Sequence, residues 1–346
     1  SSQETAADEN LQIDWKRFFK PAPNPKQRTE IAQRLKQWVD TETPEGLIKR
    51  GRNEVAVGKI LQAENSFREA LRLDSEASEA LLELAQLYIR KGDYAKSFEF
   101  LSQVYSIIKG TEDPTKAIIF RYRFALALSL IARGEREEGH KVLSDLIMLD
   151  SSFTPAYAAL ASSYIKEEKF DIAEFIIKRG LDRAKEPDPS LLNLMGVVYE
   201  KKGNFERAKK WYAQVLEHIK GFTPSLINRA NLEIRIGNYE EAEVDAIKAL
   251  TFSPQSPEGY VTLGIIQMRT KRLAQARESF NRALEFDPEN AAARFNLAIL
   301  ESDGFNNTHE ALRLFHEVIQ SEDKEPHLKR LAENYIQEIR DNLVID

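Results

Sequence analysis

The residues that could do chemistry in this chain are few. It has five histidines and no cysteine, which excludes disulfides, thiolate zinc sites and cysteine nucleophiles. His309 and His316 are the histidines nearest in sequence, and seven residues along a helix separate them by about 10 Å, too far to share a metal ion. Paired carboxylates such as Glu240 and Glu241 are typical of a solvated helix face. We therefore expect no metal, no cofactor, no catalytic residues and no enzyme activity.

The overall composition narrows the function further. The 346 residues carry a formal net charge of -6, with 30% charged and 42% hydrophobic residues. This balance gives no general affinity for nucleic acid. No run of about 18 apolar residues occurs, so no membrane-spanning helix is expected.

A recurring motif sets the organisation of the chain. Residues 203–208 read Gly-Asn-Phe-Glu-Arg-Ala, residues 237–242 read Gly-Asn-Tyr-Glu-Glu-Ala, and residues 271–276 read Lys-Arg-Leu-Ala-Gln-Ala. A period of about 34 residues is typical of a two-helix repeat that buries its apolar face by stacking on copies of itself. The sequence therefore predicts an all-α solenoid that forms one elongated domain.

About eight repeats are expected over residues 44–325, each with a first helix (helix A) and a second helix (helix B). Apart from the third, the repeats are expected over residues 44–77, 78–111, 154–187, 189–222, 223–256, 257–290 and about 291–325. The third repeat is longer, because Gly92 and Gly134 are about eight residues further apart than the repeat period. We place the excess in an extended helix A that starts at Asp113 and Pro114, with the proline in the first helical position, and ends near Ala132.

Small residues recur in register on both helices, where they allow close helix contact. On helix A they are Ala85, Ala127, Ala161, Gly196, Ala230, Gly264 and Ala298. On helix B they are Ala63, Ser97, Ala173, Ala208, Ala242 and Ala276.

The flanking segments differ from the repeats. Residues 1–25 combine a polar start with an amphipathic stretch and a proline-rich tether, in which Trp15, Phe18 and Phe19 are candidate anchors. These aromatic residues either cap the first helix of the solenoid or dock into a groove of this chain or of a partner. A capping helix is expected over residues 26–43 and a C-terminal capping helix over residues 326–346.

The repeats resemble the tetratricopeptide repeat family across residues 44–325. This resemblance implies antiparallel helix pairs wound into a right-handed α-solenoid superhelix, with helix A lining a concave groove that receives peptides or helices. Gly139 and Gly180 stand where the family usually has alanine, and Glu233 and Gln267 stand where it often has an aromatic residue. We expect looser contacts at these four positions.

The resemblance also predicts which residues line the groove. They are Leu82, Gln86, Phe124, Leu128, Asn193, Val197, Ile227, Asn228, Asn231, Arg235, Val261, Ile265, Met268, Arg269, Phe295, Asn296 and Ile299. The apolar members indicate a binding surface, and the asparagines could bond a peptide backbone. Alternatively, the apolar residues pack on neighbouring helices and the asparagines bond carbonyls of the solenoid itself. The lysine and asparagine clamp with which some family members grip a C-terminal carboxylate is missing, so an apolar or amphipathic ligand is favoured.

The predicted function is a non-enzymatic scaffold that binds a partner peptide or helix in this groove. An assembly factor of a bacterial cell-envelope machine is the preferred setting, in the periplasm or as an outer-membrane lipoprotein rather than in the cytoplasm. The lack of cysteine and a polar start that suits a lipid anchor lost upstream of Ser1 favour it. Two alternatives stay open: a homo-oligomer assembled through the segment with Trp15, Phe18 and Phe19, and a regulatory subunit of an enzyme complex.

Overall fold

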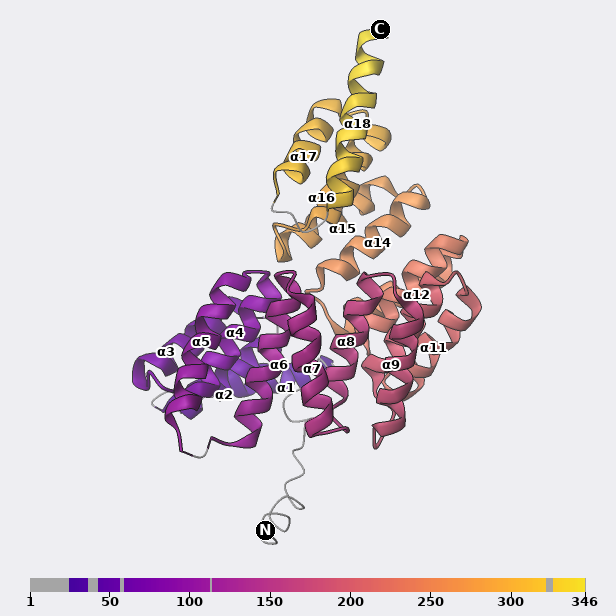
Figure 1. The fold of residues 1–346 in the computed structure, drawn as a ribbon. Helices are drawn as coiled ribbons and strands as arrows, with labels where there is room; N and C mark the ends of the chain where they lie inside the picture. Colours follow the sequence, from indigo (N-terminus) through magenta and orange to yellow (C-terminus); the bar gives the residue numbers. More distant parts are fainter. Residues whose placement is uncertain (1–24, 37–42, 57–58, 113, 322–325, 346) are drawn as a thin grey trace. The chain divides into compact units, whose positions relative to one another are not determined.

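The described part of the chain is helical. The computed structural model describes residues 25–36, 43–56, 59–112, 114–321 and 326–345. They belong to two compact units, residues 1–203 and 204–346, each of which we describe by itself. Figure 1 shows helices packed in pairs within each unit.

The helices of the first unit are α1 (Pro25–Lys36), α2 (Pro44–Ala56), α3 (Ile60–Leu73), α4 (Ser78–Lys91), α5 (Tyr94–Gly110), α6 (Lys116–Ala132), α7 (Arg136–Leu149), α8 (Thr154–Lys166), α9 (Phe170–Arg183) and α10 (Pro189–Lys201). Those of the second unit are α11 (Phe205–His218), α12 (Thr223–Ile236), α13 (Tyr239–Phe252), α14 (Pro257–Arg269), α15 (Leu273–Phe286), α16 (Ala291–Ile299) with the π-helical turn η2 (Leu300–Gly304), α17 (Thr308–Gln320) and α18 (Pro326–Ile345).

These helices stack as antiparallel pairs. The A helices are the even-numbered helices α2 to α16, and the B helices are the odd-numbered helices α3 to α17. Short links join the two helices of a pair, and in each unit they pack extensively, as in α2 with α3 and α14 with α15. The predicted all-α solenoid of antiparallel pairs is therefore confirmed.

Each stack bends toward its A helices. Consecutive A helices contact one another, as in α4 with α6 and α12 with α14. Among the described residues, consecutive B helices share no more than isolated contacts. The surface formed by the A helices is therefore the concave side of each unit, and we call it the A face.

A residue with left-handed backbone marks the turn from helix A to helix B. These residues are Gly92 (φ 74°), Gly134 (94°), Glu168 (59°), Gly203 (77°), Gly237 (87°), Lys271 (62°) and Asn306 (51°). Glycine adopts this conformation without a steric cost, which explains why it recurs at the turn. The register predicted from the glycines is confirmed at the described turns.

The small residues expected at helix contacts are buried. All the alanines predicted for this role on both helices, and Ser97, are 0% exposed. Gly196 and Gly264 are buried as well. A Cβ atom at Gly264 would lie 2.5 Å from Cε1 of Phe280 in the paired helix, so no larger residue fits there.

The expectation of looser contacts at Gly139 and Gly180 is wrong. A Cβ atom on Gly139 would lie 2.9 Å from the carbonyl oxygen of Ala127, and one on Gly180 would lie 2.9 Å from Cβ of Tyr157. Real Cβ atoms do not come so close to such neighbours. Glycine at these positions allows a closer helix approach than alanine does and leaves no gap.

The same expectation is wrong at Glu233 and Gln267, because both side chains are buried and hydrogen-bonded. Glu233 is 1% exposed and accepts a bond of 2.8 Å from Nδ2 of Asn238. Oε1 of Gln267 accepts a bond of 2.7 Å from Ser279. Polar bonds thus replace aromatic packing at these positions.

The extra residues near the third repeat are shared between two helices. α5 and α6 each have 17 residues, whereas α3 has 14 and α8 has 13. The extension of helix A to Ala132 is confirmed. Its expected start at Pro114 is wrong, because Thr115 is extended (φ -60°, ψ 137°) and α6 begins at Lys116. Asp113 lies outside the described residues.

In the first unit, a carboxylate on a B helix accepts a hydrogen bond from a tyrosine hydroxyl on the next A helix. Oε1 of Glu64 in α3 accepts a bond of 2.5 Å from the Tyr88 hydroxyl in α4. Oε1 of Glu174 in α9 accepts a bond of 3.0 Å from the Tyr199 hydroxyl in α10. These bonds tie each repeat to the one that follows.

In the second unit, two junctions carry the opposite arrangement of charge at the same positions. Nζ of Lys209 in α11 lies 2.5 Å from Oε1 of Glu233 in α12. Arg277 in α15 donates two bonds, of 2.6 and 2.7 Å, to the two carboxylate oxygens of Glu301 in η2. Here the B helix provides the cation and the next helix provides the buried carboxylate.

The C-terminal helix covers the end of the second unit. α18 buries Leu328, Ala332, Ile336 and Ile339 in the same core as α16 and α17. At the other end of the chain, α1 begins one residue before the expected capping helix of residues 26–43 and overlaps it as far as Lys36, and residues 37–42 of that segment lie outside the described residues.

Candidate functional site

The A face is the candidate binding surface, and the structure sorts the seventeen residues predicted to line it. Five are buried: Leu82, Phe124, Asn193, Val261 and Phe295. Ten are half-buried: Gln86, Leu128, Val197, Ile227, Asn228, Asn231, Ile265, Met268, Asn296 and Ile299. Arg235 and Arg269 are exposed.

Leu82 is a correction to the predicted lining. It is 0% exposed and packs in a core cluster with Leu101 and Ala125. Direct contact between α4 and α6 covers the side chain that points toward the next A helix. Phe295 is covered in a similar way, since its ring lies 5.8 Å from the Tyr335 ring of α18.

The half-buried apolar residues have two roles at once. Ile265, Met268 and Ile299 pack against the core cluster of the second unit, yet each keeps part of its side chain in solvent. Leu128 does the same in the first unit. Such side chains form a surface that is firmly held before any ligand arrives.

The asparagines are partly engaged within the solenoid. Oδ1 of Asn231 accepts a bond of 3.3 Å from Thr262, and Nδ2 of Asn296 donates one of 2.8 Å to the Ala292 carbonyl. Among the described residues, Nδ2 of Asn231 and Oδ1 of Asn296 have no hydrogen-bond partner. Each amide can therefore offer one donor or acceptor to a ligand.

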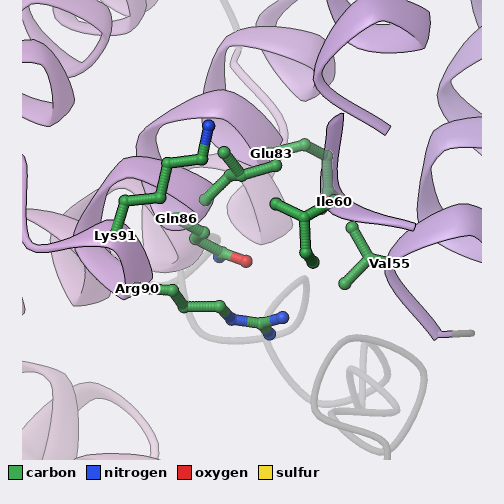
Figure 2. Close-up of a pocket in the computed structure, with 7 residues that line it drawn as sticks. Val55, Ile60, Glu83, Gln86, Arg90 and Lys91 are labelled. Atoms are coloured by element: carbon green, nitrogen blue, oxygen red, sulfur yellow. The ribbon is translucent and has the colours of Figure 1, made fainter. Parts of the chain in front are cut away.

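A pocket lies beside the A face of the first unit, between α2, α3 and α4 (Figure 2). Its volume is about 170 Å³. The lining residues are Val55, Ile60, Glu83, Gln86, Leu87, Arg90 and Lys91. Gln86 is the predicted lining residue that the structure brings to this pocket. Arg90, one helical turn further along the same side of α4, was not predicted, although Arg235, which holds the equivalent position on α12, was.

Ion pairs occupy most of the charged groups around this pocket. Oε1 of Glu83 accepts bonds of 2.7 Å from both Arg52 and Arg121, and Arg52 also binds Glu79 at 2.7 Å. Arg90 is exposed and, among the described residues, forms no ion pair or hydrogen bond through its side chain. Within the part of the chain that the structure describes, Arg90 is therefore an unpaired cation at the edge of the pocket.

Lys91 belongs to a separate network around Glu64. That carboxylate accepts bonds from Lys91 (2.5 Å), Tyr88 (2.5 Å) and Arg68 (3.0 Å). Burial raises the pKa of Glu64, but the three bonds outweigh burial and hold the pKa at about 2. Glu64 is thus ionised at neutral pH and keeps Lys91 in place.

A second, more open cleft of about 440 Å³ lies between α11, α12 and α13. Charged groups line it, and most are paired: Arg229 binds Asp245 at 2.6 and 2.7 Å, and Lys209 binds Glu233. These two ion pairs lie across the cleft and hold its charged walls together.

No arrangement for metal chemistry is found in the described part of the chain. His140 is a structural residue, since Nε2 lies 2.7 Å from the Ser163 hydroxyl and the ring lies 4.7 Å from that of Tyr164. Burial lowers the pKa of His140. The described helices include none that is long and apolar enough to cross a membrane. Trp15, Phe18 and Phe19 lie outside the described residues.

The sequence reasoning missed exposed apolar residues on the B helices of each unit. Met148 is 77% exposed, Phe175 59%, Val244 52% and Ile247 51%. The signal was present, because Val244 and Ile247 are three residues apart on α13, away from the small residues that face the core.

Comparisons with known proteins agree with this architecture. Family models described as tetratricopeptide repeat match residues 48–115, 189–217 and 257–290. Anaphase-promoting complex subunit CDC16 of Saccharomyces cerevisiae is 25% identical over 210 residues, which are 49% of this chain and 25% of that protein. Hsp70-Hsp90 organizing protein 3 of Arabidopsis thaliana is 23% identical over 254 residues, 70% of this chain and 43% of that protein. The chain thus spans less than half the length of these relatives.

A solved structure shows the same fold. A chain of the APC/C hetero-tetramer Cut9–Hcn1 aligns with a TM-score of 0.58 and 13% identity, over 91% of this chain and 58% of that chain. At this level of identity the likeness shows the fold alone.

Proposed function

Because this chain belongs to the tetratricopeptide repeat family, whose repeats serve protein–protein interaction, we propose that its A face binds an extended or helical segment of a partner protein. One observation carries the proposal. In both units the A face presents side chains that are held by the core on one side and open to solvent on the other, such as Leu128 and Met268. Exposed apolar area on a concave surface, with amides beside it, is typical of a site for a peptide.

A selection from a random-peptide display library on the full chain tests this proposal. We expect it to yield peptides rich in apolar residues. The variant with Asn231→Ala and Met268→Ala should raise their Kd at least about tenfold, because both side chains face the A face and truncation removes contact area.

The matched control variant truncates the B-helix surface. Val244→Ala with Ile247→Ala truncates two apolar side chains that are more exposed than Asn231 and Met268. We expect it to leave the Kd unchanged within about twofold. Loss of binding in the control but not in the A-face variant would move the site to the B helices and overturn the proposal.

The cell-envelope setting remains part of the proposal. It is supported by the cysteine-free composition and the polar first residues. The gene sequence that encodes the upstream residues tests it: a lipobox that ends in cysteine just before Ser1 supports a lipoprotein, and an ordinary start without one removes this setting.

Assembly through the Trp15, Phe18 and Phe19 segment also stays a prediction, and sedimentation of the chain with and without residues 1–25 tests it.

A further inference from the structure

We propose that the pocket between α2, α3 and α4 is a side-chain subsite of the A face. It receives one aliphatic side chain of a bound peptide while Arg90 binds the carboxylate of an adjacent acidic residue of that peptide. This inference rests on the proposed function, and it names the partner chemistry that one part of the A face selects.

The size of the pocket limits its occupant to a single side chain. A volume of about 170 Å³ is close to the roughly 150 Å³ that holds one benzene ring in an engineered apolar cavity. Sites for free drug-sized molecules are larger, from about 300 Å³ upward. The pocket therefore suits one side chain of a larger ligand better than an independent small molecule.

The walls of the pocket select an aliphatic side chain. Val55 of α2 and Ile60 of α3 are half-buried, and Leu87 of α4 is 4% exposed. Three branched side chains from three helices therefore line the cavity, and Figure 2 shows two of them, Val55 and Ile60, beside one another. A guest aliphatic group would remove the remaining exposed apolar surface of Val55 and Ile60 from water, which favours binding.

The charges at the edge favour an acidic neighbour in the peptide. Glu83 is engaged by Arg52 and Arg121, and Lys91 is engaged by Glu64. These ion pairs leave the guanidinium of Arg90 as the group that can accept a new carboxylate. An arginine binds a carboxylate with two parallel hydrogen bonds, which fixes direction as well as affinity.

Gln86 completes the site as a contact for the peptide backbone. It lines the pocket, and in the described part of the chain its amide makes no side-chain hydrogen bond. Figure 2 shows Gln86 above the Arg90 side chain, with Ile60 to the right of both. A peptide that places its aliphatic side chain between them brings a backbone N–H or C=O within reach of the amide.

The experiment uses peptides selected on the full chain by display, in versions with Asp or Asn beside the aliphatic residue. We expect an acidic–aliphatic pair among the enriched sequences. Arg90→Gln should weaken the Asp peptide at least about tenfold and the Asn peptide by less than about twofold, because only the former has a charge for Arg90 to bind. Arg136→Gln, a change of another exposed arginine in the first unit, is the matched control and should affect neither.

A second variant tests the cavity without removing any packing. In the wild type, we expect the Kd of the Leu peptide to be at least about tenfold lower than that of the Ala peptide. Val55→Trp fills the pocket and should abolish this preference. Val244→Trp on α13 is its control and should keep the preference. Melting temperatures of the four variants confirm that each one folds.

The outcomes separate this inference from the proposed function. If selected peptides bind the A face of the first unit but do not depend on Arg90 or Val55, the subsite is wrong and the A-face proposal stands. If free acetate binds at Arg90 as tightly as the peptide does, the site is a small-anion site and the side-chain subsite is wrong. If no peptide binds the A face at all, both proposals fall.

Discussion

Single residue pairs connect successive repeats, and their chemistry differs between the two units. Glu64 with Tyr88 represents the first unit, and Lys209 with Glu233 represents the second. Each pair joins a B helix to the next A helix through the same two positions. A buried carboxylate such as Glu233, 1% exposed, is tolerated only because a cation and an amide satisfy it.

Reversing one charge of such a pair should destabilise the second unit. Lys209→Glu sets two carboxylates against one another beside buried Glu233, and we expect a loss of about 2–4 kcal/mol. Urea denaturation measures it. The double variant with Lys209→Glu and Glu233→Tyr recreates the arrangement of the first unit and should recover at least half of the loss. No recovery would show that the two arrangements are not equivalent.

Low pH should lower the stability of the first unit, because it protonates the carboxylates that join successive repeats, such as Glu174. Hydrogen bonds from Lys178 and Lys202, stronger together than the opposing effect of burial, lower the pKa of Glu174 to about 2 from an ordinary value of 4.5. Because the pKa is lowered in the folded state, this stabilisation is complete above pH 4.5 and is lost as the pH falls from 4.5 toward 2.

Glu174→Gln should therefore reduce the difference between urea midpoints measured at neutral pH and near pH 3. The control is Glu138→Gln, which changes an exposed carboxylate of α7 that makes no ion pair among the described residues. An unchanged pH dependence in the Glu174 variant would contradict the role of these bonds.

At the scale of the helix pair, three of the described turns have a residue other than glycine in left-handed backbone, and Lys271 and Glu168 are two of them. Lys271 and Glu168 have φ of 62° and 59°, where a Cβ atom costs about 1–2 kcal/mol. Lys271→Gly should stabilise the second unit by up to about 1 kcal/mol, since the gain is partly offset by the entropy of glycine in the unfolded chain. Lys271→Ala keeps the Cβ atom and should give no gain. Urea midpoints of the two variants decide the matter.

The helix pairs were largely predictable from sequence, because close packing restricts residue types strongly. Small residues such as Ala85 and Ala242, and turn glycines such as Gly92, set the period and the register. The exceptions depend on local backbone geometry. The extended conformation of Thr115 moves the start of α6, and the close approach at Gly139 depends on helix distance, which no single residue type encodes.

The candidate site was less predictable than the fold. A periodic pattern indicates which side of helix A a residue occupies, but not how much of that side the neighbouring A helix covers. Leu82 is buried for this reason, whereas Gln86, one turn later, is not. The pocket beside Gln86 depends on Val55 and Ile60 from the preceding pair, and a search within one repeat cannot find it.

At the scale of the whole molecule, a repeat stack depends on how its ends are closed. In the second unit, Tyr335 of α18 stacks on Phe315 at 5.3 Å, and Ile336 is 6% exposed. Without such a helix, the apolar side of the last pair would face water. Closure at the end therefore contributes to solubility as well as to stability.

Ile336→Asp should lower the stability of the second unit by about 3 kcal/mol or more, because it buries a charge and removes apolar contacts. Leu331→Asp on the same helix is the matched control, since Leu331 is 40% exposed, and it should cost less than about 1 kcal/mol. Light scattering on heating should show earlier aggregation of the Ile336 variant. Equal effects of the two substitutions would contradict closure by this face of α18.

The opposite charge arrangements of the two units restrict how this chain can evolve. A duplication or exchange that placed the helix with Glu174 before the helix with Glu233 would bring two carboxylates together where each now has a partner. A tyrosine placed after Lys209 would in turn leave the lysine without an acid. A new junction between these two kinds of helix therefore needs a second, compensating substitution.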